Sequence, residues 1–268
     1  MNSSIVALPG LMAHGSGALW VPESKTLILA DVHLGYGWAQ RRKGELGPLA
    51  DARAREKLSA VCREFTPARI VFLGDLVHAP RPCGPERAWI EETLTQLAEA
   101  SELMVVRGNH DRAFAREFGH LPVEFRESWS NDTLTAIHGD RLAIALPEHH
   151  TLILGHLHPS LTVKDAAGAS QKLPIFLVTP HCIVIPAFSP FARGYDVADG
   201  LPAELAPFFR EDEIEVIAVS GQRAIRLGPL HRALERLFSG ATGPARYQLG
   251  YRAPSGVLFK PLPDKAAK

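Results

Sequence analysis

Apolar residues along the chain form short continuous segments that alternate with longer segments of helical period. The segments Thr26–Ala30, Arg69–Leu73 and Leu103–Val106 are rich in β-branched residues, which predicts strands buried on both faces. Between them, Leu49–Phe65 and Glu86–Ala100 carry apolar residues at helical spacing and are predicted to be amphipathic helices. A β-α-β-α-β order with right-handed crossovers places the strands side by side, with their carboxyl ends together. The pattern therefore predicts an α/β fold.

The second half of the chain predicts shorter strands and one late helix. The strands predicted there are Thr133–Ile137, Leu152–Leu154, Ile175–Val178, Cys182–Ile185, Glu215–Val219 and Ala224–Leu227. One further strand, Ala18–Pro22, is predicted near the start of the chain. Pro229–Phe238 is predicted to be a short helix, followed by a partly disordered end rich in Pro, Gly and Ala. We therefore expect a main domain over residues 1–228 and a C-terminal helix and tail over residues 229–268.

The basic residues near the end of the chain allow two interpretations. Nine Lys or Arg residues follow Gln222, against only Glu235 and Asp264. A basic tail binds nucleic acid through phosphates, but it also serves as a solubilising extension. The sequence does not decide between these two roles.

Composition narrows the class of protein without naming a substrate. The chain has 268 residues, is 46% hydrophobic and has zero formal net charge, so no global field points to nucleic acid or a membrane. Three cysteines without Cys-x-x-Cys spacing indicate free thiols in a reducing compartment. No apolar run approaches the length of a membrane span. We therefore expect a soluble cytoplasmic protein with no membrane partner.

Residues that could bind metal ions or transfer protons lie at the ends of five predicted strands. The residues concerned are Asp31 and His33, Asp75, Asn109 and His110, His138, and His156 and His158. Taken alone, each of these motifs is also typical of an ordinary polar turn without a chemical role, since Gly and Asn favour turns. Together they draw only on Asp, Asn and His, which are ligands for borderline divalent metals. They are too many for one tetrahedral zinc site and include no thiolate, so they suit two adjacent ions bridged by a carboxylate.

These motifs, in this order, resemble those of the calcineurin-like metallophosphoesterases over roughly residues 26 to 159. A narrower resemblance, to small ICC-like phosphoesterases, is carried by Asp31–Tyr36, Gly74–His78, Gly155–Pro159, Pro186–Pro190 and Gly194–Val197. That group includes ligase-associated DNA-damage-response endonucleases and archaeal proteins related to SbcD. The segment after about Pro229 is longer than in the compact members, which leaves substrate and partners open.

The resemblance implies a four-layer αββα sandwich, with two mixed sheets flanked by helices and two divalent ions at the strand ends. It implies that Asp31, His33, Asp75 and His158 hold one ion, and that Asp75, Asn109, His138 and His156 hold the other, with Asp75 as the bridge. Manganese is the first expectation, because mixed oxygen and nitrogen ligands tolerate it, but iron, zinc and nickel fit the same residues.

The function implied is a phosphodiesterase or nuclease acting on DNA or another nucleic acid through a metal-bridging hydroxide, with DNA-repair proteins as partners. Two alternatives stay open: hydrolysis of a small nucleotide or phosphomonoester, and a non-catalytic scaffold of the same fold. The complete ligand set and the retained His110 count against the scaffold.

Four other positions are candidates for catalysis or substrate binding. His110 has no assigned ion, so it is free to protonate the leaving oxygen, and Asp111 is expected to orient it and raise its pKa. His78 either contacts substrate or makes a structural hydrogen bond. The glycine-rich segment of residues 35–47, with Arg41 and Arg42, either holds a phosphate backbone or is a solvated loop or helix start.

Overall fold

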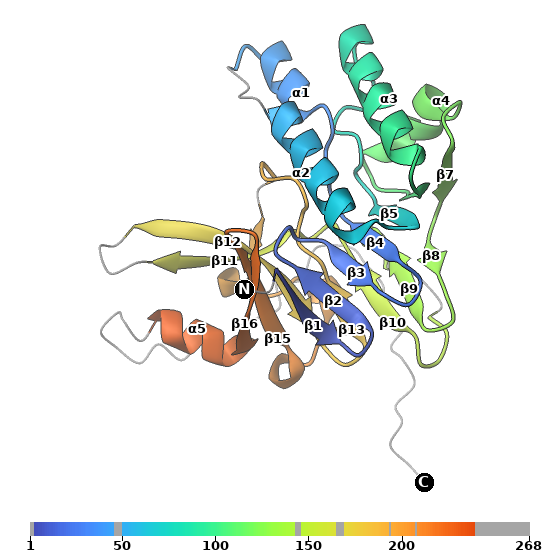
Figure 1. The fold of residues 1–268 in the computed structure, drawn as a ribbon. Coiled ribbons are helices and arrows are strands. Elements are labelled where there is room, and N and C mark those ends of the chain that lie inside the picture. The colour runs from blue at the N-terminus through green and yellow to red at the C-terminus, as the bar shows by residue number, and fades with distance from the viewer. Residues whose placement is uncertain are drawn as a thin grey trace.

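The computed structural model describes residues 3–45, 50–142, 146–164, 169–192, 194–206 and 208–238, and shows a four-layer αββα sandwich (Figure 1). In the described part of the chain, the first sheet has seven strands in the order β1-β2-β3-β4-β5-β6-β7. Their bounds are Ser4–Leu8, Leu11–His14, Leu19–Val21, Thr26–Leu29, Arg69–Leu73, Glu102–Val106 and Val123–Arg126. Strands β1 to β4 are antiparallel, whereas β4 to β7 are parallel neighbours.

The second sheet follows the order β14-β11-β12-β13-β10-β9-β8, with β15 beside β12 and β16 beside β15. From β8 to β16, the bounds are Trp129–Ser130, Leu134–Ile137, Thr151–Leu154, Pro159–Lys164, Ser170–Val178, Cys182–Val184, Tyr195–Asp196, Glu215–Ser220 and Arg223–Pro229. The helices α1 to α5 are Tyr36–Arg42, Ala50–Phe65, Gly84–Ala98, Phe114–Phe118 and Leu230–Phe238. Short 3-10 turns lie at Asp111–Ala113, Val197–Asp199, Ala203–Leu205 and Glu211–Glu213.

Three hydrophobic layers hold the sandwich together, and strand alternation assigns each side chain to one of them. On β4, Leu27 and Leu29 pack with α2 and α3, while Ile28 faces the second sheet. On β12, Phe176 faces the first sheet and Leu177 faces the layer beneath α5. Because both faces are buried, these strands are continuously apolar, and each large side chain stabilises the fold by about 1.5–3 kcal/mol.

The predicted β4-β5-β6 core is confirmed, with helix α2 crossing from β4 to β5 and α3 from β5 to β6. The helix over Gly84–Ala98 begins two residues earlier than expected, because Cys83 and Glu86 form a capping box and Pro85 suits the first turn. Residues 35–47 had been expected as a loop or helix start, and α1 forms there.

Two regions differ from the sequence-based expectation. Strands β1 and β2 had not been predicted, because Pro9 and Gly10 interrupt a weakly apolar segment; in the structure Gly10, with a φ of 77°, lies in the turn of a hairpin. Strand β12 begins at Ser170 instead of Ile175, and its polar start pairs with β11 in a ribbon that projects from the sandwich (Figure 1). The strand predictions depend on buried apolar residues, and this ribbon has polar residues on both faces, so the sequence pattern did not predict it.

Helix α5 covers the outer face of the second sheet. Its residues Leu230, Ala233 and Leu234 are buried against that sheet. Residues 239–268 lie outside the described part of the chain, so the roles of the tail and the domain division stay predictions. None of the helices in the described ranges has both the length and the apolar composition that a bilayer crossing requires.

Candidate metal centre

The carboxyl ends of parallel strands from both sheets meet at one edge of the sandwich. The candidate ligands follow these strands: Asp31 and His33 after β4, Asp75 after β5, Asn109 after β6, His138 after β9, and His156 and His158 after β10. Six of these side chains, all but that of Asn109, form two adjacent groups, in which the ligand atoms of each group lie within 4.8 Å of one another. The five motifs separated along the sequence are therefore one site in space.

The first group contains Asp31, His33 and His158. The Nε2 atom of His158 lies 2.9 Å from Oδ1 of Asp31, and the other carboxylate oxygen accepts the backbone N–H of His156 at 3.0 Å. The Nδ1 atom of His33 is buried and has no hydrogen-bond partner among the described residues. A buried ring nitrogen without a partner is costly unless a cation or a donor takes its lone pair.

The second group contains Asp75, His138 and His156. The Nδ1 atom of His138 lies 3.0 Å from the carbonyl oxygen of Leu73, which only accepts, so in the neutral ring Nδ1 carries the proton and Nε2 the lone pair. That Nε2 atom lies 3.1 Å from Oδ1 of Asn109 and 3.1 Å from Nδ1 of His156. It also lies 3.6 Å from Oδ1 of Asp75.

The donor set fits divalent cations. Carboxylate oxygens, an amide oxygen and imidazole lone pairs converge without a lysine or arginine among them. Such electron-rich atoms repel one another unless a cation lies between them, and mixed oxygen and nitrogen donors suit borderline divalent ions. The two groups are joined through Asp31, whose Oδ1 lies 3.9 Å from Nδ1 of His138. The bridging role of Asp75 stays a prediction, because the structure groups Asp75 only with His138 and His156.

Burial keeps the imidazoles of His33 and His156 in the neutral form that binds metal. Burial lowers the pKa of His33 to about 3; Asp31 opposes this shift, and neighbouring imidazoles reinforce it. Burial, together with His138, also lowers the pKa of His156, again opposed by nearby carboxylates. Burial alone would raise the pKa of Asp31, but the hydrogen bond to His158 and the nearby imidazoles bring it below its ordinary value. Neutral imidazole and ionised carboxylate are the forms that ligate metals.

The ligand residues adopt a rare backbone conformation. Five of the nine non-glycine residues with positive φ in the described ranges are Asp31, His33, Asp75, His156 and His158, with φ between 49° and 62°. Left-handed backbone costs energy for residues with a Cβ and persists where the surroundings impose it, most often at functional sites. Here it occurs in the turns that follow β4, β5 and β10.

Two glycines allow these strand ends to approach one another. A Cβ on Gly108 would collide with the carboxylate and the backbone nitrogen of Asp75. A Cβ on Gly74, whose φ is 76°, would collide with the ring of His138. The Gly-Asp and Gly-Asn-His-Asp motifs therefore need glycine for close packing around the ligands.

Asp111 has a role other than the one predicted from the sequence. Its buried carboxylate accepts the backbone N–H groups of Asp75 at 2.6 Å, Gly108 at 3.1 Å and Val77 at 3.4 Å. Burial and the neighbouring Asp75 raise the pKa of Asp111 to about 6, against the effect of these N–H groups. The expectation that Asp111 orients His110 is therefore wrong: a carboxylate in this position ties the ends of β5 and β6 together.

The ring of His110 is oriented by a backbone carbonyl instead. Its Nδ1 lies 3.2 Å from the carbonyl oxygen of His78, and its backbone N–H donates to Oδ1 of Asp75 at 2.8 Å. Its Nε2 lies 3.9 Å from Oδ2 of Asp75, and 39% of the side chain is exposed. Nε2 is thus the atom available to a substrate at the metal centre.

The predicted substrate-binding residues lie near the site with partners of their own. The ring of His78 is 5.3 Å from the ring of His33, and burial, followed by His110, lowers its pKa to about 4. Arg41 pairs with Asp51 at 3.2 Å and lies over the ring of Trp38, while Arg42 pairs with the buried Glu86. Substrate binding by Arg41, Arg42 and His78 stays a prediction.

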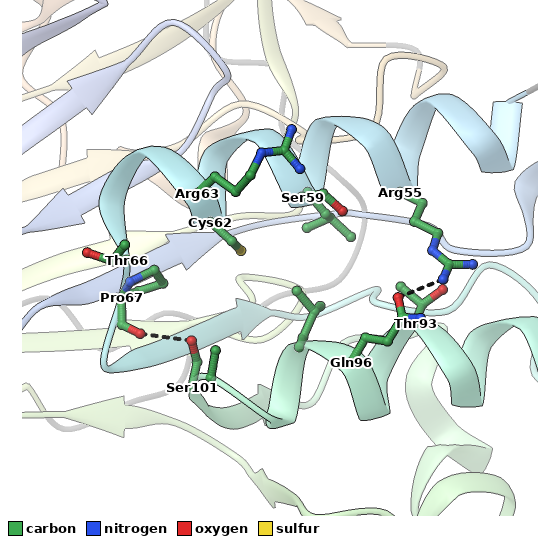
Figure 2. A pocket seen from close by; sticks show the side chains of 12 residues that line it. Arg55, Ser59, Cys62, Arg63, Thr66, Pro67, Thr93, Gln96 and Ser101 are labelled. Carbon is green, nitrogen blue, oxygen red and sulfur yellow. Dashed lines mark hydrogen bonds between the residues drawn. The ribbon is translucent and has the colours of Figure 1, made fainter.

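A separate pocket of about 370 Å³ lies on the outer helical layer between α2 and α3 (Figure 2). Arg55 reaches across it to Gln96 at 2.6 Å, and Ser101 donates to the carbonyl of Pro67 at 2.8 Å (Figure 2). No candidate ligand lines this pocket. It is a gap between helices and has no part in the metal centre.

Comparison with known proteins identifies the family. The family model described as calcineurin-like phosphoesterase matches residues 24–219, which include every candidate ligand and His110. The chain belongs to the calcineurin-like phosphoesterase family. A search of the curated proteins finds no match.

Two solved structures are among those similar to this calcineurin-like phosphoesterase. The nuclease MPE of Pseudomonas putida is 20% identical, with a TM-score of 0.62 over 84% of this chain and 98% of that chain. The phosphoesterase YfcE of E. coli is 18% identical, with a TM-score of 0.41 over 76% of this chain and 98% of that chain. Membership of the family implies hydrolysis of phosphoesters and dependence on two metal ions, and the two ligand groups agree with that dependence.

Proposed function

We propose that this protein is a phosphodiesterase of the nuclease type, acting on DNA or another nucleic acid with two bound manganese ions. One observation supports this proposal above all: two complete groups of oxygen and nitrogen ligands lie side by side at the strand ends of a phosphoesterase fold. Asp31, His33 and His158 would hold one ion, and Asp75, Asn109, His138 and His156 the other. When bound, two such ions lower the pKa of a water molecule and neutralise charge on the phosphoryl oxygens.

The chain's own residues supply proton transfer and positioning. The carbonyl of His78 fixes the ring of His110 through Nδ1, so a proton on Nε2 would be delivered to the leaving oxygen. Asp111 holds the backbones of Asp75 and Gly108 in place, which keeps the ligands of the two strands facing one another. In-line displacement at phosphorus needs such fixed groups more than it needs covalent chemistry.

The nucleic-acid substrate is the finer part of the proposal. It is supported by the sequence motifs shared with small ICC-like phosphoesterases, and the Pseudomonas putida protein of similar fold is described as a nuclease. Association with DNA-repair proteins and a cytoplasmic location are further parts of this proposal, the latter supported by three free cysteines.

The test is a comparison of substrates under defined metals. The full chain is freed of metal, single metals are added back, and bis-p-nitrophenyl phosphate, p-nitrophenyl phosphate, single-stranded DNA, duplex DNA and cyclic nucleotides are compared. We expect manganese-dependent hydrolysis of the diester and of DNA, with the monoester a poor substrate. A clear preference for the monoester or for cyclic nucleotides would contradict the nuclease assignment, and hydrolysis of none of them would contradict catalysis.

A further inference from the structure

A pocket of about 420 Å³ opens beside the first ligand group. His158 forms part of its wall, so the pocket adjoins the first ligand group. Phe191, Pro190, Lys172 and Ser189 contribute to the rest of the lining. The volume lies within the range of about 300–1,000 Å³ that is typical of small-molecule sites. The roles given to the metal ligands and to His110 do not involve this pocket.

One wall of the pocket is a fixed aromatic surface. The rings of Phe191 and Tyr36 are stacked with centroids 5.7 Å apart and an angle of 9° between their planes. Tyr36 begins α1, and the centroid of its ring also lies 5.0 Å from that of the His78 ring. Phe191 is half-buried, so part of the ring stays open to the pocket. An aromatic ring held this way stacks a planar base with little loss of conformational entropy.

The lining of the pocket also carries a positive charge. Lys172 lies on the polar start of β12, is exposed, and donates from its ammonium group to the carbonyl of Gly194. A carbonyl partner leaves the charge of the lysine uncompensated, and no acidic residue is among those lining the pocket in the described ranges. An ammonium in such surroundings attracts phosphate.

We propose that this pocket is a subsite for single-stranded nucleic acid, in which the base beside the scissile phosphate stacks on Phe191 and the next phosphate contacts Lys172. The inference rests on the proposed function, since it takes the metal centre as the position of the scissile phosphate. A phosphomonoester has no flanking nucleotide to fill the subsite. A base within a duplex is already stacked on its neighbours, so the subsite favours a single strand.

The test separates the subsite from the metal centre. Four variants of the manganese-loaded full chain are compared: Phe191→Leu, Phe191→Tyr, Lys172→Gln and Lys25→Gln. Lys25 is an exposed lysine before β4, at the end of that strand opposite Asp31, and serves as the matched control. Binding of a labelled single-stranded phosphorothioate oligonucleotide is followed by fluorescence anisotropy at several salt concentrations. Hydrolysis of bis-p-nitrophenyl phosphate is measured on the same samples.

We expect Phe191→Leu to weaken oligonucleotide binding by roughly 5- to 100-fold, as for loss of one stacked base, and Phe191→Tyr to restore most of it. Lys172→Gln should reduce the slope of log affinity against log salt by about 0.7, as for one lost phosphate contact on a single strand, while Lys25→Gln leaves it unchanged. Lys25→Gln should hydrolyse the small diester like the parent protein, whereas Phe191→Leu and Lys172→Gln should lose far more oligonucleotide binding than diester hydrolysis.

Two results would overturn the subsite. Unchanged oligonucleotide binding in both Phe191→Leu and Lys172→Gln would show that the pocket takes no nucleotide, while diester hydrolysis would still support the proposed function. Equal losses in oligonucleotide binding and diester hydrolysis would show that these residues act on the metal centre itself. Loss of all hydrolysis in the parent protein would instead contradict the proposed function.

Discussion

The carboxylate of Asp111 accepts the backbone N–H of Asp75 at 2.6 Å, although the two residues are 36 positions apart. The same carboxylate accepts the N–H of Gly108, so one buried side chain joins the turns that follow β5 and β6. Hydrogen bonds to an ionised acceptor are among the strong ones, and a buried N–H left without a partner is costly. Asp111 is thus a positioning residue that sets the distance between Asp75 and Asn109.

Replacing Asp111 should therefore weaken metal binding and leave the proton-transfer behaviour unchanged. Asp111→Asn retains the shape but turns an amide toward backbone donors, so we expect a 10- to 100-fold loss in affinity for one ion, a loss of roughly the size seen for groups that support metal ligands. Metal affinity by calorimetry and the pH profile of diester hydrolysis at saturating manganese check this. A shifted pH profile with unchanged metal affinity would restore Asp111 as the partner of His110.

Gly108 offers a steric test of the same arrangement. In Gly108→Ala the new Cβ would collide with the carboxylate and backbone nitrogen of Asp75, so we expect loss of an ion and destabilisation by about 1–3 kcal/mol. Gly84→Ala is the matched control, because a Cβ at that position meets no atom within 4 Å. Metal content and urea denaturation measure both effects. If the two alanine variants bind metal equally well, close packing at Gly108 is not what holds Asp75 in place.

The sequence predicts the buried framework well, and it predicts residues that the structure brings together in two groups, because both follow from local patterns. Strands such as Arg69–Leu73 are apolar on both faces, and Asp, Asn and His recur where such strands end. The pairing of Asp111 could not be predicted from spacing, since proximity to His110 in the sequence suggested the wrong partner. Backbone N–H donors that converge on a carboxylate only after folding leave no pattern in the sequence.

The polar surface features were the least predictable. The first three residues of β12 in the ribbon of β11 and β12 are exposed, so this part of the ribbon has no hydrophobic pattern. Arg42 is a candidate for substrate binding, and the structure pairs its guanidinium with Glu86, a buried carboxylate on α3. A buried acid near the start of a helix resembles an ordinary capping residue in the sequence, which Glu86 also is.

His110 separates metal binding from proton transfer. His110→Ala removes Nε2 but no predicted ligand, so both ions and the fold should be retained. A nucleoside alkoxide needs a proton to leave, whereas p-nitrophenolate barely does, and general acid catalysis contributes roughly a hundred- to ten-thousand-fold. DNA hydrolysis should therefore fall far more than hydrolysis of p-nitrophenyl esters. Equal declines on both substrates, with metals retained, would mean that His110 acts through positioning or charge.

Lys57 provides a prediction on stability and pH. Its ammonium, on α2, donates to the carbonyl of Phe188 at 2.6 Å and lies 4.1 Å from the centroid of that ring. Burial lowers the pKa of Lys57 from 10.5 to about 7. Between these values the unfolded chain binds more protons than the folded chain, so this group makes the free energy of unfolding rise with pH, by at most about 1.4 kcal/mol per pH unit.

Lys57→Met lacks this titration and is the appropriate comparison. The difference in free energy of unfolding, wild type minus Lys57→Met, should increase between pH 7.5 and pH 9.5 in urea titrations. Parallel pH dependences of the two proteins would show that the Lys57 ammonium is not desolvated in the folded state.

The central claim, a two-metal phosphodiesterase centre, is tested most directly by metal content and activity measured on the same samples of wild type and Asp75→Asn. Asp75→Asn removes a negative charge from the ligand set at little change in shape. For wild type we predict two manganese ions per chain and hydrolysis of bis-p-nitrophenyl phosphate that disappears with chelation and returns with metal. For Asp75→Asn we predict loss of at least one ion together with nearly all hydrolysis. Two ions in an inactive Asp75→Asn protein, or hydrolysis by metal-free wild type, would contradict the account.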